Sequence, residues 1–277
     1  MSILVILMPG KKRGNEMKKI YTLYCRVFQY IIKIGNYFIG YKTPKCIEGA
    51  NKIQKLGALL AKKHINDVLV VSGESMVKRG QVQPMLDGFD KYHIRYTLKT
   101  YTTTDPTSDD VEEGFNTYIK HDCKAIVALG GGSRIDCAKA IAARVARPKK
   151  DISQLQGLLK VRKKIPPFIA IPTTAGAGSE TTIASVITHS RSGCKASIID
   201  PCLIPKYVVL DPQLCVGLPP KTTAMTGMDA LCHAIEAYTN KTYNTPFEDE
   251  LAKEAVSLIY NNIVLACEDG TNLEARC

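Results

Sequence analysis

From residue 67 onward, apolar runs alternate with segments of helical pattern. Strands are predicted for four segments: DVLVVSG at 67–73, HIRYTLKTY at 93–101, KAIVAL at 124–129 and PPFIAIP at 166–172. Three helices are predicted between these strands: a weak helix over 75–92, a helix that starts at Thr107 or Ser108, and a helix over 133–146. Strands that alternate with helices indicate a parallel α/β sheet with right-handed crossovers.

The pattern changes after Thr181. Three short segments, at 181–190, 194–200 and 207–212, have the texture of β-ribbon strands separated by turns. From Pro219 onward the chain has helical periodicity. We therefore expect an α/β domain over 41–218, with a β-ribbon near 182–210, followed over 219–277 by the first part of an all-helical domain.

The first forty residues are treated as a separate N-terminal region. Residues 1–16 fit no element and are expected to form a loose extension. The segment 20–40 is strongly apolar, but Arg26, Gln29 and Lys33 interrupt it at helical spacing. This spacing predicts an amphipathic helix that packs on the protein rather than one that spans a membrane. The charges near the N-terminus follow the apolar run, which is the wrong order for a signal peptide.

Composition narrows the class of protein only moderately. The 277 residues carry a formal net charge of +11, but the basic residues are dispersed and form no stripe interleaved with aromatic side chains. Nucleic acid is therefore not an expected partner, and neither is a membrane. The ten Cys residues form no CxxC pair, which favours a reducing cytoplasm over a disulfide framework.

The first candidate for chemistry is the segment ALGGGSRIDCAKAIA at 128–142. A strand ends at Leu129, three glycines follow, and a helix opens at Ser133. This arrangement allows close approach of a phosphate to free backbone N–H groups. A tight βα turn without a ligand is the alternative. Asp136 could bond within the turn and Lys139 could neutralise a phosphate, or either could be a solvated helix residue.

A second strand leads into the loop PTTAGAGSE at 172–180. Thr173, Thr174 and Ser179 carry hydroxyls that can donate to phosphate or ribose, and the glycines allow close approach. Together, the two loops suggest neighbouring strand ends that hold one dinucleotide.

A third candidate lies in TAMTGMDALCHAIEAY at 223–238, where Asp229 and His233 are four residues apart. They share one helical face, as a pair of divalent-metal ligands would. On spacing alone, a capped or solvated pair is the more common explanation, and Glu236 is no stronger a candidate.

In this order, the segments GGGSRIDCAK, PTTAGAGSE and DPQLCVGLPPKTTAMTGMDALCHAIEAY resemble the iron-containing (group III, metal-dependent) alcohol dehydrogenase family. The resemblance runs from about Tyr24 to the last residue. It implies a Rossmann-like N-terminal domain followed by an all-α C-terminal domain, the architecture shared with dehydroquinate synthase. It also implies that NAD(P) and a metal, Fe²⁺ or Zn²⁺, lie between the two domains.

The resemblance also implies roles for individual residues. Gly131, Gly132 and Ser133 would hold the pyrophosphate, with Asp136 nearby. Thr173 and Thr174 would contact the cofactor, and Lys195 and Leu214 would line its ribose–nicotinamide end. Asp229 and His233 would be metal ligands.

Gly73 departs from the family pattern, because many members carry Asp after this strand. An Asp would bond the adenosine ribose and repel a 2′-phosphate. Its absence, with Lys78 and Arg79 close in the sequence, favours NADP over NAD. Ala177 replaces the family's usual Thr and removes one hydroxyl near the cofactor.

The family has four metal ligands, one Asp and three His, and the last two His would lie downstream of Cys277. The chain is therefore expected to be C-terminally truncated. Its function would be hydride transfer between a small alcohol or aldehyde and NAD(P), with the metal polarising the substrate oxygen. No residue is identified as a catalytic acid or base. The alternative is a non-catalytic nucleotide-binding remnant. A homodimer is compatible with either interpretation.

Overall fold

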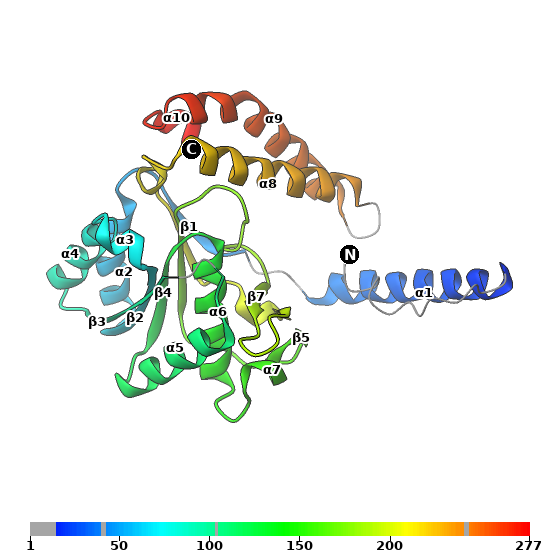
Figure 1. Cartoon of the computed structure of the whole chain (residues 1–277), viewed down its shortest axis with the longest axis horizontal. Coiled ribbons are helices and arrows are strands. Elements are labelled where there is room, and N and C mark those ends of the chain that lie inside the picture. Colours follow the sequence, from blue (N-terminus) through cyan, green and yellow to red (C-terminus); the bar gives the residue numbers. More distant parts are fainter. Residues whose placement is uncertain (1–14, 40–42, 103–104, 241–243) are drawn as a thin grey trace.

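The computed structural model describes residues 15–39, 43–102, 105–240 and 244–277. Its centre is a parallel sheet of six strands in the order β1-β9-β6-β4-β2-β3 (Figure 1). The strands are β1 (Lys45–Glu48), β9 (Tyr207–Leu210), β6 (Phe168–Pro172), β4 (Ala125–Gly130), β2 (Asp67–Gly73) and β3 (Arg95–Tyr101). All their pairings are parallel, as the alternating pattern predicts.

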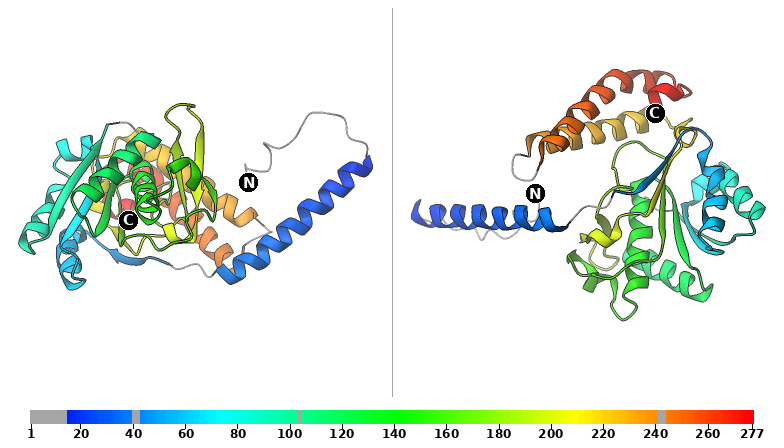
Figure 2. Two further views of the ribbon diagram at one scale, coloured as in Figure 1. Left: turned by 90° about the horizontal axis from the view of Figure 1, so that it is seen from below. Right: turned by 180° about the vertical axis from the view of Figure 1, so that it is seen from behind.

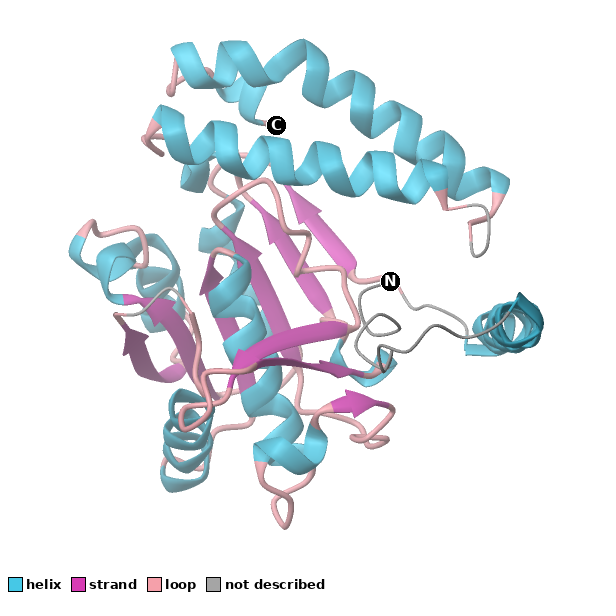
Figure 3. Ribbon diagram, turned by 45° about the vertical axis from the view of Figure 1, so that its right-hand side comes forward, coloured by secondary structure: helices cyan, strands magenta, loops and turns pink. Residues whose placement is uncertain are grey.

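Helices cover both faces of this sheet (Figure 3). One face carries α5 (Ser108–Lys120), α6 (Gly132–Ala146) and α7 (Ile152–Leu155). The other carries η2 (Lys52–Lys55), α2 (Leu56–Lys62), α3 (Glu74–Lys78) and α4 (Gln83–Lys91). Alternate residues of each strand enter the two cores: Leu69 and Val71 pack with α6, whereas Val68 and Val70 pack with α4. Burial on both faces explains why these strands are continuous apolar runs.

The predicted helix start near residue 107 is confirmed. Thr107 is the N-cap of α5, its side chain accepts from the backbone N–H of Asp110, and the Asp110 carboxylate accepts from the N–H of Thr107. This capping box satisfies N–H groups that the first helical turn leaves free. Asp105 and Pro106, directly before this cap, line a cavity together with Gly132 of the first glycine loop.

The β-ribbon prediction is correct for two of its three segments. β7 (Ala184–Thr188) and β8 (Lys195–Ile199) pair antiparallel, and β5 (Gly157–Leu158) extends this small second sheet. The third segment was assigned wrongly, because β9 lies in the main sheet between β1 and β6. Its first three residues are buried, so the run YVVL is a core strand. A short apolar run indicates burial but does not tell which sheet a strand joins.

The N-terminal helix α1 (Asn15–Ile39) forms, but its predicted packing on the protein is wrong. It projects away from the rest of the described chain (Figures 1 and 2). Leu23, Tyr24 and Tyr30 are each about two-thirds exposed. Helical periodicity determines which side chains share a face, but it does not supply a surface to cover that face. None of the described helices is both long and apolar enough to cross a bilayer.

Beyond the sheet, the chain becomes helical at Pro220, where the sequence predicts the change. α8 (Pro220–Thr239) and α9 (Pro246–Glu268) pack side by side, and α10 (Leu273–Arg276) follows. The short helices η3 (Pro201–Leu203) and η4 (Pro212–Cys215) flank β9. Figure 1 shows the α8–α9 pair lying across one end of the parallel sheet. Residues 1–14, which include most of the predicted loose extension, lie outside the described residues.

Close backbone packing of α2 against α4 gives a test of the fold. A Cβ atom on Gly57 would lie 2.1 Å from the carbonyl oxygen of Gly88. Gly57→Ala adds helix propensity worth about 1 kcal/mol, but the contact is with backbone and cannot relax locally. We expect the free energy of unfolding to fall by about 1–3 kcal/mol in chemical denaturation. Lys62→Ala, on the exposed side of α2, should be near neutral. A more stable Gly57→Ala protein would contradict this packing.

Candidate functional site

The two glycine loops lie side by side, as the sequence predicts. β4 and β6 are adjacent parallel strands, Gly130 pairs with Pro172, and the N–H of Thr173 donates to the carbonyl of Gly130 at 3.2 Å. The carboxyl ends of both strands therefore open at the same edge of the sheet, where α/β proteins bind ligands.

The two loops approach each other closely at their glycines. A Cβ atom on Gly132 would lie 3.0 Å from Cβ of Ala177 and 3.0 Å from Oγ of Ser179. One on Gly131 would lie 3.3 Å from Oγ1 of Thr174. These separations are tighter than most real Cβ contacts. The glycines thus serve the packing of one loop on the other as well as any approach of a ligand.

The N-terminus of α6 has no side-chain cap. Gly131 occupies the N-cap position and has no side chain that could accept from the first turn. A 15-residue helix carries partial positive charge at this end, together with backbone N–H groups free of intrahelical partners. This combination favours an anion beside Gly132 and Ser133.

A cavity of about 200 Å³ opens at this helix end. Among its lining residues are Ser133, Asp136, Ser179, Lys195 and Asp105. Lys195, at the start of β8, forms an ion pair with Asp105 in which Nζ and Oδ1 are 3.1 Å apart, and both side chains are more than half exposed. Such an exposed pair is weak, so the Lys195 ammonium is available to a ligand. Sequence reasoning missed Asp105, because no local motif marks a partner ninety residues away.

Not every predicted cofactor residue reaches this cavity. Leu214 is 5% exposed and packs in the core on the α4 side of the sheet. Thr173 is also buried, while Thr174 lines a neighbouring cavity of about 310 Å³ together with Glu180. The roles of these three residues in cofactor binding stay predictions.

Asp136 connects α6 to the β-ribbon. Its Oδ2 accepts from the backbone N–H of Val186 at 2.9 Å, and its carbonyl accepts from the Ser185 hydroxyl at 2.7 Å. Burial raises the pKa of Asp136, whereas the Val186 N–H and the nearby Lys139 ammonium lower it. The predicted bond within its own turn is wrong, because both partners lie on β7, and these bonds also exclude a solvated helix position.

Both sequence predictions for Lys139, a cation that neutralises a phosphate and a solvated helix residue, are wrong. It is neither solvated nor directed at a ligand, because its side chain is fully buried. Its Nζ donates to the carbonyl of Thr182 at 2.6 Å, to Oγ1 of Thr182 at 2.9 Å and to the carbonyl of Ala184 at 3.0 Å. Burial lowers the pKa of Lys139 to about 8. The ammonium holds the end of the second loop and the start of β7 against α6.

Gly73 ends β2 beside the first glycine loop. A Cβ atom placed there would meet Cγ of Met76 at 3.6 Å and Nε of Arg134 at 3.8 Å, which are ordinary contact distances. The position therefore has room for the beginning of a side chain. Sequence reasoning missed Arg134, because its approach to residue 73 depends on the pairing of β2 with β4.

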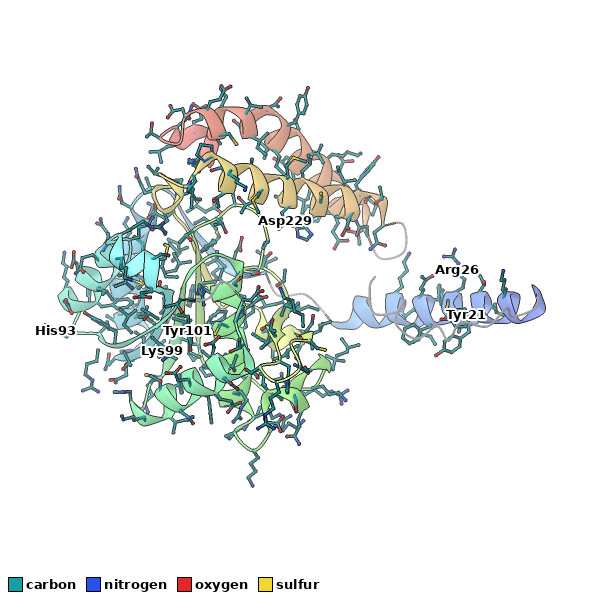
Figure 4. All side chains as sticks on the ribbon, in the orientation of Figure 1. Tyr21, Arg26, His93, Lys99, Tyr101 and Asp229 are labelled. Carbon is teal, nitrogen blue, oxygen red and sulfur yellow. The ribbon has the colours of Figure 1, made fainter. Side chains whose placement is uncertain are left out.

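The predicted metal ligands face each other on α8. Oδ1 of Asp229 lies 3.6 Å from Nε2 of His233, and the two side chains are 52% and 58% exposed. Figure 4 shows Asp229 on the side of α8 that faces the α/β domain. A carboxylate oxygen and an imidazole nitrogen at this separation suit Fe²⁺ or Zn²⁺ as part of a ligand set. Within the described residues, no cluster of three His, Cys, Asp or Glu side chains completes it.

α8 rests on the second glycine loop. A Cβ atom on Gly176 would lie 2.7 Å from the carbonyl oxygen of Thr226 and 2.8 Å from its Cβ. Thr226 is one turn before Asp229 and two turns before His233. A single loop therefore touches the uncapped end of α6 on one side and the helix with the metal-type pair on the other.

Comparison with known proteins agrees with this geometry. Residues 43–212 match the family described as iron-containing alcohol dehydrogenase. The chain belongs to this family. Residues 223–277 match the C-terminal part of the Fe-containing alcohol dehydrogenase family, which corresponds to α8, α9 and α10. The expected architecture, a Rossmann-like domain followed by a helical region, is confirmed by the solved structures that resemble it.

Two curated relatives show the extent of the similarity. Choline dehydrogenase of Bacillus subtilis (strain 168) is 35% identical over 242 residues, covering 86% of this chain and 60% of that protein. The NAD-dependent methanol dehydrogenase of Bacillus methanolicus is 35% identical over 241 residues, covering 87% and 62%. The chain thus spans about three fifths of the length of these relatives.

Against solved structures, the chain again spans about three fifths of the matched protein's length. A crystal structure of 1,3-propanediol oxidoreductase matches with a TM-score of 0.81 and 33% identity, covering 86% of this chain and 62% of that one. Sulfoacetaldehyde reductase from Bifidobacterium kashiwanohense, in complex with NAD⁺, matches with a TM-score of 0.78 and 32% identity, covering the same shares.

The buried Lys139 predicts a distinctive pH dependence of stability. Its pKa is about 8 in the folded chain and 10.5 as the unperturbed value. Below pH 8 both states hold the proton, and folding buries a charge. Between pH 8 and 10.5 the unfolded state binds more protons, so the free energy of unfolding rises with pH.

We expect this rise to reach roughly 3 kcal/mol, measured as the difference between the wild-type chain and Lys139→Met in urea denaturation across this range. The variant serves as the reference, because other titrating groups contribute equally to both proteins. A difference that stays constant from pH 7 to 10.5 would contradict a buried ammonium at this position.

Proposed function

We propose that this chain is the nucleotide-binding part, and half of the metal site, of an NAD(P)-dependent alcohol dehydrogenase. The enzyme would be an oxidoreductase that transfers a hydride between a small alcohol or aldehyde and the cofactor. The observation that carries the proposal is the loop at 172–180. It contacts the uncapped end of α6 through Ala177 and Ser179 and contacts α8 through Gly176. A dinucleotide in one place and a metal-bound substrate in the other would therefore be neighbours.

The chain's own residues have distinct tasks in this proposal. Backbone N–H groups of Gly132 and Ser133 would bind the pyrophosphate at the helix end. Thr174 would donate its hydroxyl to the cofactor, and Lys195 would exchange its exposed pairing with Asp105 for a ribose hydroxyl. Asp136 would hold the β-ribbon, and with it Lys195, in position through the Val186 N–H.

Asp229 and His233 would hold the metal, and the family favours iron over zinc. When bound, a divalent ion supplies a Lewis acid that polarises the substrate oxygen. The half-exposed positions of both side chains leave the ion accessible to substrate. Two protein donors hold a divalent ion loosely, so affinity for the metal in this chain should be low.

The cofactor is proposed to be NADP rather than NAD, because Gly73 places no carboxylate at the end of β2. A carboxylate there would accept from the ribose hydroxyls of NAD and repel the 2′-phosphate of NADP. The space beside Gly73 is open enough for a side chain, so the absence of Asp is not imposed by packing.

A second candidate function is nucleotide binding without turnover. It is favoured by one observation, that the described residues bring only two metal-type donors together on α8. The two candidates share the glycine loops and differ only in whether the helical segment supports chemistry.

The test uses the 277-residue chain supplied with Fe²⁺ or Zn²⁺, NADPH and butanal. Cofactor binding is followed by NADPH fluorescence and turnover by the loss of NADPH absorbance. We expect NADPH binding, and turnover that disappears in Asp229→Ala and His233→Ala while binding remains. Binding without turnover in the wild-type chain supports the second candidate. Absence of NADPH and NADH binding refutes both.

Gly73→Asp tests the cofactor preference directly. The new carboxylate should weaken NADPH binding at least tenfold through repulsion of the 2′-phosphate, and leave NADH binding equal or stronger. Gly80→Asp is the matched control. It adds the same charge beyond the other end of α3, where a Cβ atom would meet nothing within 4 Å; the φ of +69° strains the backbone there, which lowers stability but does not distinguish the two cofactors. Gly80→Asp should not change the ratio of the two affinities, and an unchanged ratio in Gly73→Asp would contradict the proposed preference.

A further inference from the structure

Arg134 lies in the first turn of α6 and is almost fully buried, with 8% of its surface exposed. Within the described residues, its Nη1 makes no hydrogen bond, although the atom is shielded from solvent. A buried guanidinium without a hydrogen-bonded anion is costly, because the charge loses its hydration and is offset only by the Tyr101 ring and by an Asp110 carboxylate that forms no ion pair with it. Burial lowers the pKa of Arg134 accordingly. Such a group in a folded protein calls for an explanation.

A second arginine on the same helix shows how a buried guanidinium in this chain is paired with a carboxylate. Arg144 is 6% exposed, and its guanidinium lies 4.2 Å from the Phe115 ring centroid. Its Nε and Nη2 both donate to the Glu112 carboxylate. Arg134 likewise lies over an aromatic ring, that of Tyr101 at 5.8 Å, which is labelled in Figure 4. No carboxylate of the described residues forms an ion pair with it. The aromatic support is present at both arginines, and only Arg134 lacks the anion.

The guanidinium of Arg134 lies beside the end of β2. Its Nε lies 3.8 Å from the position that a Cβ atom on Gly73 would occupy. A Cβ atom on Gly130 would collide with Cγ of Arg134 at 2.6 Å, so the first glycine of the loop makes room for this side chain. The guanidinium thus lies between the uncapped end of α6 and the strand end that faces the adenosine ribose in the proposed function.

The other cations near this strand end are exposed. Nζ of Lys78 pairs with Glu74 at 2.8 Å on the surface of α3, and Nε of Arg79 donates to Gln81 at 3.1 Å. The sequence pointed to Lys78 and Arg79 because they are close along the chain. Water can hydrate both of these side chains, whereas the buried Arg134 has a donor that neither water nor the described residues satisfy.

We propose that Arg134 is the residue that binds the 2′-phosphate of NADP, and so determines the cofactor that this site selects. The proposal rests on the proposed function, because it takes the glycine loops to hold a dinucleotide. A phosphate monoester supplies the charge and the acceptor oxygens that a planar guanidinium fork matches. The Tyr101 ring holds the guanidinium in place before the ligand arrives, so little conformational freedom is lost on binding.

In this proposal, the residue at position 73 determines whether Arg134 is free to bind the phosphate. An Asp at position 73 would begin within contact distance of Nε of Arg134. It would form an ion pair with the guanidinium and occupy the place of the phosphate. Gly73 therefore contributes by leaving Arg134 unpaired, in addition to removing a repulsive charge.

The experiment titrates the whole chain with 2′,5′-ADP and with 5′-AMP, using isothermal titration calorimetry. These probes share the adenosine and the 5′-phosphate and differ only in the 2′-phosphate, and inorganic phosphate is added as a third titrant. In the wild-type chain, 2′,5′-ADP should bind at least tenfold more tightly than 5′-AMP, because a charge-assisted pair forms in a buried place.

Arg134→Met should remove this advantage while leaving affinity for 5′-AMP within about twofold. Arg134→Lys should restore part of it, since Lys keeps the charge but not the fork. Arg79→Met, which removes an exposed guanidinium that donates to Gln81, should leave the ratio of the two affinities unchanged. In Gly73→Asp the advantage of 2′,5′-ADP should already be lost, and the further change Arg134→Met should not restore it, because it leaves the Asp carboxylate unpaired.

The outcomes separate this inference from the function on which it rests. If 5′-AMP binds and 2′,5′-ADP binds no better, or if Arg134→Met weakens both equally, the inference is wrong and the nucleotide site stands. If neither nucleotide binds the wild-type chain, both fail. Circular dichroism melting of each variant identifies loss of folding, and in that case Arg134→Lys and Gly73→Asp, which keep a polar group in place, carry the decision.

Discussion

The arrangement of the candidate site depends on the close approach of two backbone loops at the carboxyl ends of β4 and β6. Gly132 lies against Ala177 and Ser179 so closely that a Cβ atom there would require these side chains to shift. Because the strands are hydrogen-bonded neighbours, this contact is set by the sheet itself. The uncapped end of α6 and the loop that supports α8 are thereby held together as one unit.

Two buried ionisable groups extend this unit to the β-ribbon. Lys139 donates to Thr182 and Ala184 from inside α6, and Asp136 accepts from Val186. Both resemble cofactor ligands when only the sequence is considered, since each follows a glycine cluster by a few residues. Their partners show that they position the ribbon, and through it Lys195, which lines the same cavity as Gly132 and Ser133 at the helix end.

The helical segment has a different character. Several large apolar side chains of α8 and α9 are exposed, among them Met225 at 64%, Phe247 at 71% and Tyr260 at 79%. The metal-type pair lies half exposed on α8. The chain spans about three fifths of its relatives' length. Binding and turnover by this chain are therefore proposed, whereas its fold is observed. The nucleotide half of the site is built within the described residues, whereas the metal half has two donors.

The sequence by itself determined the features that depend on short-range pattern. Continuous apolar runs predicted the strands of the sheet, the glycine clusters predicted the loops at their ends, and the spacing of Asp229 and His233 placed both on one face of a helix. These follow from periodicity and backbone sterics, which act over a few residues. Tertiary structure alone decided that β9 joins the main sheet, that α1 remains uncovered, and that Lys139 is buried. It also brought Arg134 beside Gly73, sixty-one residues earlier in the chain. Each of these depends on which distant segments meet, and a local pattern of residues carries no information about its partner.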